Sequence, residues 1–171
     1  LRKNLGVYGY SLGKGQIENE DFKAKILRAN EEGVSFEIMG KNIRKKMFSP
    51  LKGTHFIENL TGAILVARLF NVSWKDIERA CLDTESLFRT MEVFRTETGG
   101  TIIDDSYNST PKGFLSALNY LAILKNKRKV VVTPGIIELG NYSREGHRKI
   151  AREVSNKADE LVLISEDFYE I

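Results

Sequence analysis

The first third of the chain alternates between apolar and polar positions with a period of two. The alternation runs through residues 22–30 (FKAKILRAN) and again through residues 34–39 (VSFEIM), with the turn residues EEG between them. A period of two is typical of a strand with one buried face, so these runs predict a β-hairpin. The run NIRKKMF, residues 42–48, predicts a third strand.

The period then changes to that of helices. Residues 57–70 (IENLTGAILVARLF) are apolar nearly all round, which predicts a helix buried between other elements. Ser73 precedes a second helical run, WKDIERACL, and Asp76 lies three residues after it. This spacing predicts an N-cap with a capping box.

From residue 91 onward the pattern predicts strands that alternate with helices. The strands are expected at 91–94, 101–104, 129–133 and 160–164, and the helices at 111–124 and 143–157. Such alternation favours βαβ units, a parallel sheet and an α/β fold class, with a domain boundary near residues 84–90. Because the chain ends just after a strand, we expect this sheet to be truncated.

Composition indicates a soluble globular chain without an obvious nucleic-acid partner. Its 171 residues suffice for one ordinary domain or two small ones, and 26 Lys and Arg against 23 Asp and Glu leave a formal charge of only +3. The densest basic run, KNKRK at 125–129, is interpreted as a solvated loop, with a phosphate or nucleic-acid patch as the alternative.

The single cysteine, Cys81, excludes an internal disulfide and a cysteine-ligated metal site. Its helical neighbours favour a small buried residue over a nucleophile, which is consistent with a reducing compartment. No apolar run approaches the ~20 residues of a membrane span, so we expect a cytoplasmic protein with no membrane partner.

Polar chemistry gathers where the strand at 101–104 ends. Asp104 and Asp105 are followed by Tyr107 and Asn108, and Ser109 or Thr110 is placed to cap the next helix. Ligands of parallel sheets bind at the carboxyl ends of strands, where the two carboxylates could hold ribose hydroxyls, a metal or a proton. The alternative is that one carboxylate caps the turn and the other is solvated.

A second strand end has the same layout. The strand at 129–133 runs into Thr-Pro-Gly, and Glu138 and Gly140 precede the next helix. Two such loops on neighbouring strands predict a shared crevice.

Three motifs together resemble the Mur ligases. The first is DDSYNSTP at 104–111, where the family typically has DDSYNANP, and the second is ELG at 138–140, followed by a helix containing His147. The third is GTHFIEN at 53–59, which is similar to the family's G-x-H-N-x-x-N stretch. The resemblance implies that residues 1–88 are the end of a central ATP-binding domain. Residues 89–171 would begin a Rossmann-like C-terminal domain.

The resemblance also implies roles for six residues in ATP binding. Asn59 would contact the adenine and Asp105 the ribose hydroxyls, while Tyr107 would lie against the nucleotide with Asn108 nearby. Arg89 is the expected phosphate ligand. His55 organises its loop in the favoured interpretation and binds nucleotide in the other. His147 is interpreted as a packing or capping residue outside the site.

Three departures from the family pattern are visible. Phe56 replaces the usual asparagine, and Thr90 rather than Arg89 lies at the usual spacing ahead of Asp105. TPG replaces the more common GDM before ELG. These changes indicate a divergent branch and leave the acceptor open.

The resemblance implies a ligase that uses ATP and Mg²⁺ and works through an acyl phosphate. Such an enzyme adds D-alanyl-D-alanine to a UDP-N-acetylmuramoyl-peptide in cell-wall precursor synthesis. No G-x-x-x-x-G-K-[ST] is present, since LGKGQ at 12–16 is too short, so the chain alone is expected to be inactive without the remainder of its polypeptide. The alternatives are a related amide ligase with another acceptor and a non-catalytic nucleotide-binding module. A dinucleotide-binding fold is disfavoured because G-x-G-x-x-G is missing.

Overall fold

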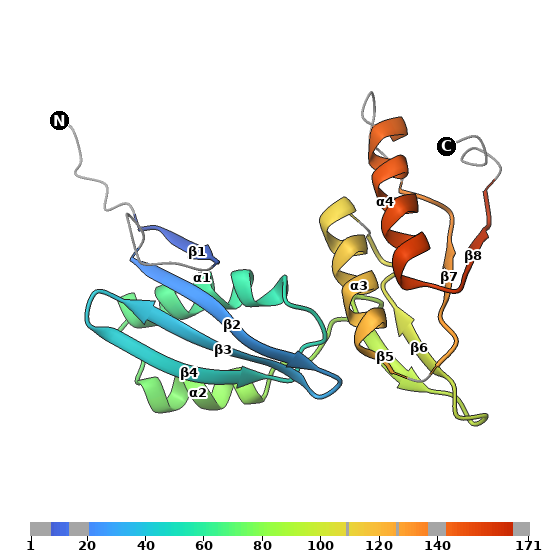
Figure 1. The fold of residues 1–171 in the computed structure, drawn as a ribbon. Coiled ribbons are helices and arrows are strands. Elements are labelled where there is room, and N and C mark those ends of the chain that lie inside the picture. Colours follow the sequence, from blue (N-terminus) through green and yellow to red (C-terminus); the bar gives the residue numbers. More distant parts are fainter. Residues whose placement is uncertain (1–7, 14–20, 109, 126, 137–142, 166–171) are drawn as a thin grey trace. The chain divides into compact units, whose positions relative to one another are not determined.

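The structure of the chain is a computed structural model that describes residues 8–13, 21–108, 110–125, 127–136 and 143–165 (Figure 1). The chain divides into two compact units, Leu1–Glu85 and Ser86–Ile171. This division falls inside the boundary region expected at residues 84–90. The assignment of residues 1–88 and 89–171 to two particular ligase domains stays a prediction.

The first unit contains a four-stranded sheet in the order β1-β2-β3-β4. Its strands are β1 (Tyr10–Leu12), β2 (Phe22–Asn30), β3 (Gly33–Gly40) and β4 (Ile43–Ser49). β1 pairs with β2 in parallel, and the pairs β2–β3 and β3–β4 are antiparallel. The predicted hairpin and third strand are therefore confirmed.

The tight turn between β2 and β3 requires the residue types found at Asn30 and Gly33. The Asn30 side chain accepts hydrogen bonds from the backbone N–H groups of Glu32 and Gly33, each at 3.1 Å. Gly33 has a φ of 152°, and a Cβ there would lie 2.2 Å from the carbonyl oxygen of Ser49. Only glycine fits this close approach of two strands.

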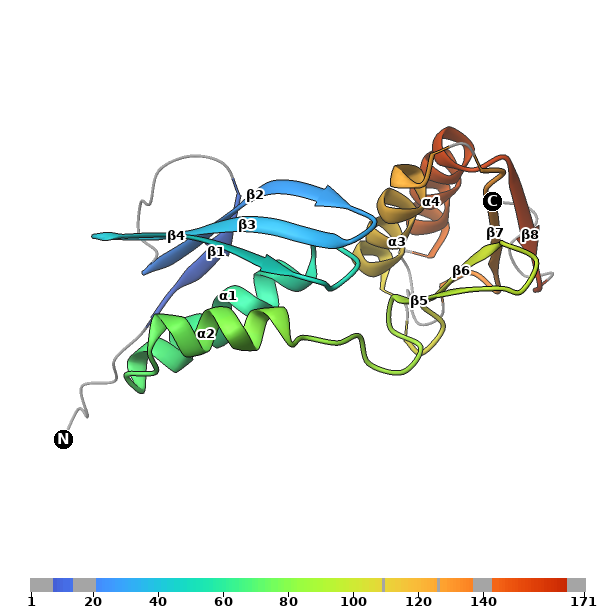
Figure 2. The ribbon, with the colours of Figure 1, turned by 90° about the horizontal axis from the view of Figure 1, so that it is seen from below.

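Two helices, α1 (Phe56–Leu69) and α2 (Trp74–Leu82), cover one face of this sheet, as Figure 2 shows. α1 directs Ile57, Thr61, Ile64 and Leu65 into the core. Val66 and Leu69 are 53% and 43% exposed, so the expectation of a helix buried between other elements is wrong on this face. The helix packs on the sheet along one face, which leaves part of its apolar surface outside the core of this unit.

The start of α2 follows the prediction from the sequence. The Ser73 hydroxyl accepts a hydrogen bond from the Asp76 backbone N–H at 3.2 Å and donates one to the Asp76 carboxylate at 2.6 Å. The pair thus forms a variant of the capping box, in which the carboxylate binds the hydroxyl of the N-cap residue.

The second unit alternates strands and helices as predicted, with boundaries that differ by no more than one residue. Its elements are β5 (Glu92–Arg95), β6 (Thr101–Asp104), α3 (Pro111–Ile123), β7 (Val130–Thr133), α4 (Ser143–Lys157) and β8 (Glu160–Leu163). Buried residues of α3, α4 and the loop after β7 form a separate core of Leu118, Ile136, Ile150 and Val154.

The pairing of the strands differs in part from the expectation of one parallel sheet. β7 and β8 pair in parallel around α4, but β5 and β6 pair antiparallel. The reason is the short connection between β5 and β6, in which Thr96 N–H donates to the Gly100 carbonyl at 2.9 Å, because a parallel pair requires a longer crossover. Within the described ranges, β6 and β7 share no hydrogen-bonded ladder. The mixed α/β class with parallel strands is confirmed.

Among the residues that the structure describes, no helix is both long and apolar enough to span a membrane.

Candidate functional site

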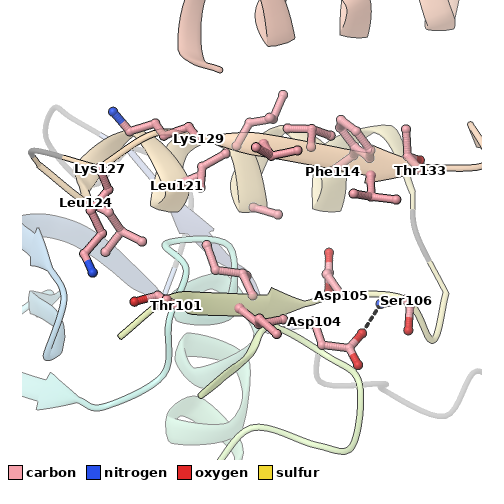
Figure 3. A pocket seen from close by; sticks show the side chains of 18 of the residues that line it. Thr101, Asp104, Asp105, Ser106, Phe114, Leu121, Leu124, Lys127, Lys129 and Thr133 are labelled. Carbon is pink, nitrogen blue, oxygen red and sulfur yellow. Dashed lines mark hydrogen bonds between the residues drawn. The ribbon is translucent and has the colours of Figure 1, made fainter. Parts of the chain in front are cut away.

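The candidate site begins where β6 ends. Asp104, half-buried, accepts a hydrogen bond from the Ser106 backbone N–H at 3.0 Å, drawn as the dashed line in Figure 3. This is the turn-capping role that was weighed for one of the two carboxylates. Asp104 therefore serves mainly to turn the chain after the strand.

Asp105 is also half-buried but faces a different partner. Its Oδ1 accepts a hydrogen bond from the backbone N–H of Met91 at 3.1 Å, and Met91 is fully buried. Burial raises the pKa of the Asp105 carboxyl above its ordinary value, the Met91 hydrogen bond lowers it, and the charge of Asp104 raises it further. The carboxylate is thus bound on one oxygen, and Oδ2 has no hydrogen-bond partner within the part of the chain described.

Tyr107, Asn108 and Arg89 are exposed beside Asp105. Tyr107 is 75% exposed, and its backbone N–H donates to the Arg89 carbonyl at 3.1 Å. The Arg89 guanidinium lies 4.9 Å from the centre of the Phe88 ring. The structure therefore brings Arg89, Asp105, Tyr107 and Asn108 together, with an aromatic ring and an amide that a ligand can reach.

The helix that follows starts with the predicted cap. Thr110 is the N-cap of α3, and its Oγ1 accepts a hydrogen bond from the Gly113 N–H at 3.1 Å, with Pro111 at the first helical position. Ser109, the other candidate, lies outside the described residues. The positive end of the α3 dipole thus points toward the loop that follows β6.

The loop after β7 is held by a buried histidine. His147 Nε2 accepts a hydrogen bond from the Ile136 backbone N–H at 2.9 Å, and Nδ1 lies 2.7 Å from the Ser143 carbonyl oxygen. Nε2 accepts and Nδ1 donates, so the imidazole is neutral with its proton on Nδ1. This agrees with the interpretation of His147 as a packing residue. Glu138 and Gly140 lie outside the described residues.

Both strand-end loops line one cavity of about 1190 Å³ in the second unit. β6 and β7 border it on two sides, and Phe114, Leu121 and Leu124 of the α3 region form an apolar wall (Figure 3). Asp104 and Asp105 lie at one end of the cavity, and Lys127 and Lys129 at the other. The shared crevice is confirmed, although the two strands that border it are not hydrogen-bonded to each other.

The basic run at 125–129 connects α3 to β7, as the loop interpretation predicts. Arg128 forms an ion pair with Glu160, and the Lys127 ammonium donates to the Gly99 carbonyl at 3.4 Å. These contacts give the loop a structural role. Across the described ranges, no group of three or more His, Cys, Asp or Glu side chains is placed to hold a metal ion.

His55 and Asn59 belong to the first unit, at the start of α1. The His55 ring contacts the Phe56 ring, with centroids 4.0 Å apart and planes inclined by 37°. Asn59 is exposed on the first turn of α1. Phe56, which replaces the family's asparagine, is thus a ring partner of His55. Whether His55 and Asn59 share a nucleotide with the four residues of the second unit stays a prediction.

The sequence did not indicate the partner of Asp105. Met91 was expected only as the start of a strand, and the strand begins one residue later. Met91 and Arg89 both have positive φ values, 51° and 52°, although neither is glycine. No residue type in this turn signals a left-handed backbone, so the contact could be found only in three dimensions.

The fold and the residues around the candidate site are similar to those of the Mur ligases. Residues 90–170 match the family described as "Mur ligase, glutamate ligase domain". This confirms the resemblance inferred from the motifs.

Relatives and solved structures make the comparison more specific. The chain is 25% identical over 142 residues to the UDP-N-acetylmuramoyl-tripeptide--D-alanyl-D-alanine ligase of Bacillus subtilis, covering 82% of this chain and 31% of that protein. A crystal structure of MurF from Acinetobacter baumannii superposes with a TM-score of 0.75 at 25% identity, covering 89% of this chain and 32% of the other.

A second solved structure supports the fold alone. The MurF ligase from Thermotoga maritima, crystallised in complex with ADP, has a TM-score of 0.70 at 19% identity over 84% of this chain and 34% of that one. The chain spans about a third of the length of the relatives it matches.

Proposed function

We propose that this chain is part of an ATP-dependent Mur-type ligase in cell-wall precursor synthesis. The enzyme joins D-alanyl-D-alanine to a UDP-N-acetylmuramoyl-peptide. The observation that carries the proposal is the run Asp104–Asn108 between β6 and the capped helix α3, beside a cavity that the loop after β7 also lines. The similarity to the Bacillus subtilis ligase over 82% of the chain supports the same assignment.

The exposed groups suit an adenine nucleotide. Oδ2 of Asp105 is an acceptor for ribose hydroxyls, and the exposed ring of Tyr107 offers a flat apolar face to a base. Arg89 supplies a cation for the phosphates, and Asn108 an additional amide. His55 and Asn59 would act from the first unit, with Asn59 toward the adenine. The ADP in the Thermotoga maritima MurF complex supports ATP as the co-substrate.

The reaction has two steps. An oxygen of the substrate carboxylate bonds to the γ-phosphorus of ATP, the bond to the bridging oxygen breaks, and ADP leaves. The amine nitrogen of the dipeptide then attacks the acyl carbon, and phosphate leaves as the amide forms and the amine loses a proton. Catalysis of this kind depends on positioning and on keeping water from the acyl phosphate.

Mg²⁺ is expected for such chemistry, but these residues do not form its site. The described part of the chain contains no group of three or more metal-ligating side chains. One carboxylate oxygen of Asp104 and one of Asp105 already accept a hydrogen bond from a backbone N–H. The sequence also lacks a P-loop motif, and we expect the 171 residues alone to release no ADP from ATP. The nucleotide-linked substrates make the cytoplasm the proposed location.

A chimeric enzyme tests the function. This chain would replace the matching third of the Bacillus subtilis ligase, and ADP release would be followed with UDP-N-acetylmuramoyl-tripeptide, ATP and Mg²⁺. We expect release that depends on D-alanyl-D-alanine, and a large loss in the Asp105→Ala chimera. L-alanine and glutamate serve as control amines.

Two results would contradict the proposal. A folded chimera that responds only to another amine indicates a related ligase with a different acceptor. A folded chimera that binds ATP without any turnover indicates a non-catalytic nucleotide-binding module.

A further inference from the structure

The turn ahead of β5 has an unusual backbone. Within residues 87–91, here called the linker turn, Arg89 and Met91 have φ values of 52° and 51°. A non-glycine residue in this left-handed region is strained, because its Cβ comes too close to the following carbonyl oxygen. Two such residues so close together require contacts that hold them.

Two of those contacts come from the loop after β6. Asp105 Oδ1 accepts from the Met91 N–H at 3.1 Å, and the Tyr107 N–H donates to the Arg89 carbonyl at 3.1 Å. On the other side, the Arg89 N–H donates to the Glu92 carboxylate at 3.1 Å. The linker turn is therefore bound to the Asp105–Tyr107 loop through both of its left-handed residues.

The bond to Asp105 has the most demanding surroundings. Met91 is fully buried, and a buried backbone N–H without an acceptor destabilises the fold. The acceptor comes from a side chain 14 residues away in the sequence, rather than from the turn itself. Removal of this carboxylate frees the N–H and removes one of the contacts that oppose the backbone strain.

We propose that Asp105 is a positioning residue for Arg89. Oδ1 fixes the linker turn and thereby the direction of the Arg89 side chain, while Oδ2 faces the ligand. The inference rests on the proposed function, because it gives Arg89 the phosphates and Asp105 the ribose. It adds that the two side chains are coupled: Asp105, which would bind the ribose, also determines the position of Arg89, which would bind the phosphates.

Three variants separate this role from simple ligand binding. Asp105→Asn keeps an Oδ1 acceptor and loses the charge, whereas Asp105→Ala loses both. Arg89→Gly relieves the strain at one left-handed position, because glycine adopts positive φ at little cost. If Asp105→Ala folds poorly, the double variant Arg89→Gly/Asp105→Ala still allows exchange at the Met91 amide to be measured.

The first measurement is amide hydrogen exchange on the 171-residue chain. We expect the Met91 amide to exchange about tenfold faster or more in Asp105→Ala and near the wild-type rate in Asp105→Asn. The double variant should regain part of the stability lost in Asp105→Ala. The Arg89 side-chain resonances should lose the ring-current shift from Phe88 in Asp105→Ala alone. Unchanged Met91 exchange in Asp105→Ala overturns the proposal.

The second measurement uses the chimeric ligase and three nucleotides. The affinity ratio of ATP to AMP reports phosphate contacts, and the ratio of ATP to 2′,3′-dideoxy-ATP reports ribose contacts. Asp105→Ala should lower both affinity ratios. Asp105→Asn should lower only the ratio of ATP to 2′,3′-dideoxy-ATP (the ribose ratio), and Arg89→Ala should lower only the ratio of ATP to AMP (the phosphate ratio).

The outcomes distinguish the two proposals. If Asp105→Ala lowers only the ribose ratio, the proposal that Asp105 positions Arg89 is wrong, whereas the proposed ATP site is supported. If wild type binds no nucleotide, the proposed function fails, and exchange at Met91 together with the Arg89 resonances still decides whether Asp105 holds the linker turn.

Discussion

Cys81 is buried in the core of the first unit, with 3% of its surface exposed. Burial and the nearby Glu78 carboxylate raise the pKa of its thiol to about 11, because both disfavour the thiolate. A thiol of this kind reacts slowly, since the thiolate is the nucleophile.

We expect Cys81 to resist thiol reagents such as Ellman's reagent at pH 8 until the chain is unfolded in guanidinium. Below pH 9 the thiol is protonated in both states and its contribution to stability is complete. Between about pH 9 and 11 the unfolded chain loses its proton first, so the free energy of unfolding falls as pH rises. In the Cys81→Ala variant, measured over the same pH range, this part of the fall in the free energy of unfolding should be missing. Rapid labelling of the folded chain would show that the side chain is accessible.

His147 is buried in the second unit and hydrogen-bonds the backbone of Ile136 and that of Ser143. We expect His147→Phe to lower the free energy of unfolding by about 2 kcal/mol or more, because it leaves a buried N–H unpaired. Denaturant unfolding measures the loss, and exchange of the Ile136 amide locates it. Arg148→Ala, at an exposed neighbour, should change stability by less than about 0.5 kcal/mol. An unaltered Ile136 amide would contradict this role.

At the scale of elements, α3 is the helix that follows the candidate site. Its first turn is capped by Thr110 and preset by Pro111. Thr110→Ala should destabilise the second unit by about 1 kcal/mol, because the Gly113 N–H loses its side-chain acceptor. Thr110→Ser retains the hydroxyl and should stay near wild type in thermal unfolding. Equal effects of the two substitutions would show that the methyl group, and not the hydroxyl, matters.

The elements also show where sequence patterns were informative. Alternation in residues 22–48 predicted three strands because one face of each is buried and the other is solvated. The pattern was less informative for the burial of α1. A helix that is apolar nearly all round can still pack along one face, and the exposed side chain of Val66 shows that α1 does so. Strand direction was missed for β5 and β6, because strand patterns do not specify whether a pair is parallel.

At the scale of the whole molecule, the two units have separate cores. One is built around Phe36 and Ile38, and the other around Leu118 and Ile150. We expect Phe36→Ala, which removes a fully buried ring, to cost about 3–5 kcal/mol and to speed amide exchange in the first unit only. Leu118→Ala should affect only α3, α4 and their strands. Loss of protection in both units from either substitution would mean that they unfold as one.

The candidate site was predictable in part for a physical reason. Asp104 ends β6 and Asp105 and Tyr107 come just after it, so local sequence determines that they lie at the carboxyl end of the strand. The convergence of this loop with the one after β7 followed from the βαβ pattern, and one cavity is lined by both. The hydrogen bond from the Met91 N–H to the Asp105 carboxylate was not predictable, because the two residues come together only when β5 and β6 pair as a hairpin.

The sequence by itself determined the elements other than β1, their boundaries to about one residue, the cap of α2, and the motifs that resemble the Mur ligase domain, because hydrophobic period and capping act over a few residues. Only the tertiary structure decided the antiparallel pairing of β5 with β6 and the hydrogen-bond partners of His147 and Asp105. These features join groups that are distant along the chain, and their energies depend on which surfaces the folded backbone brings into contact.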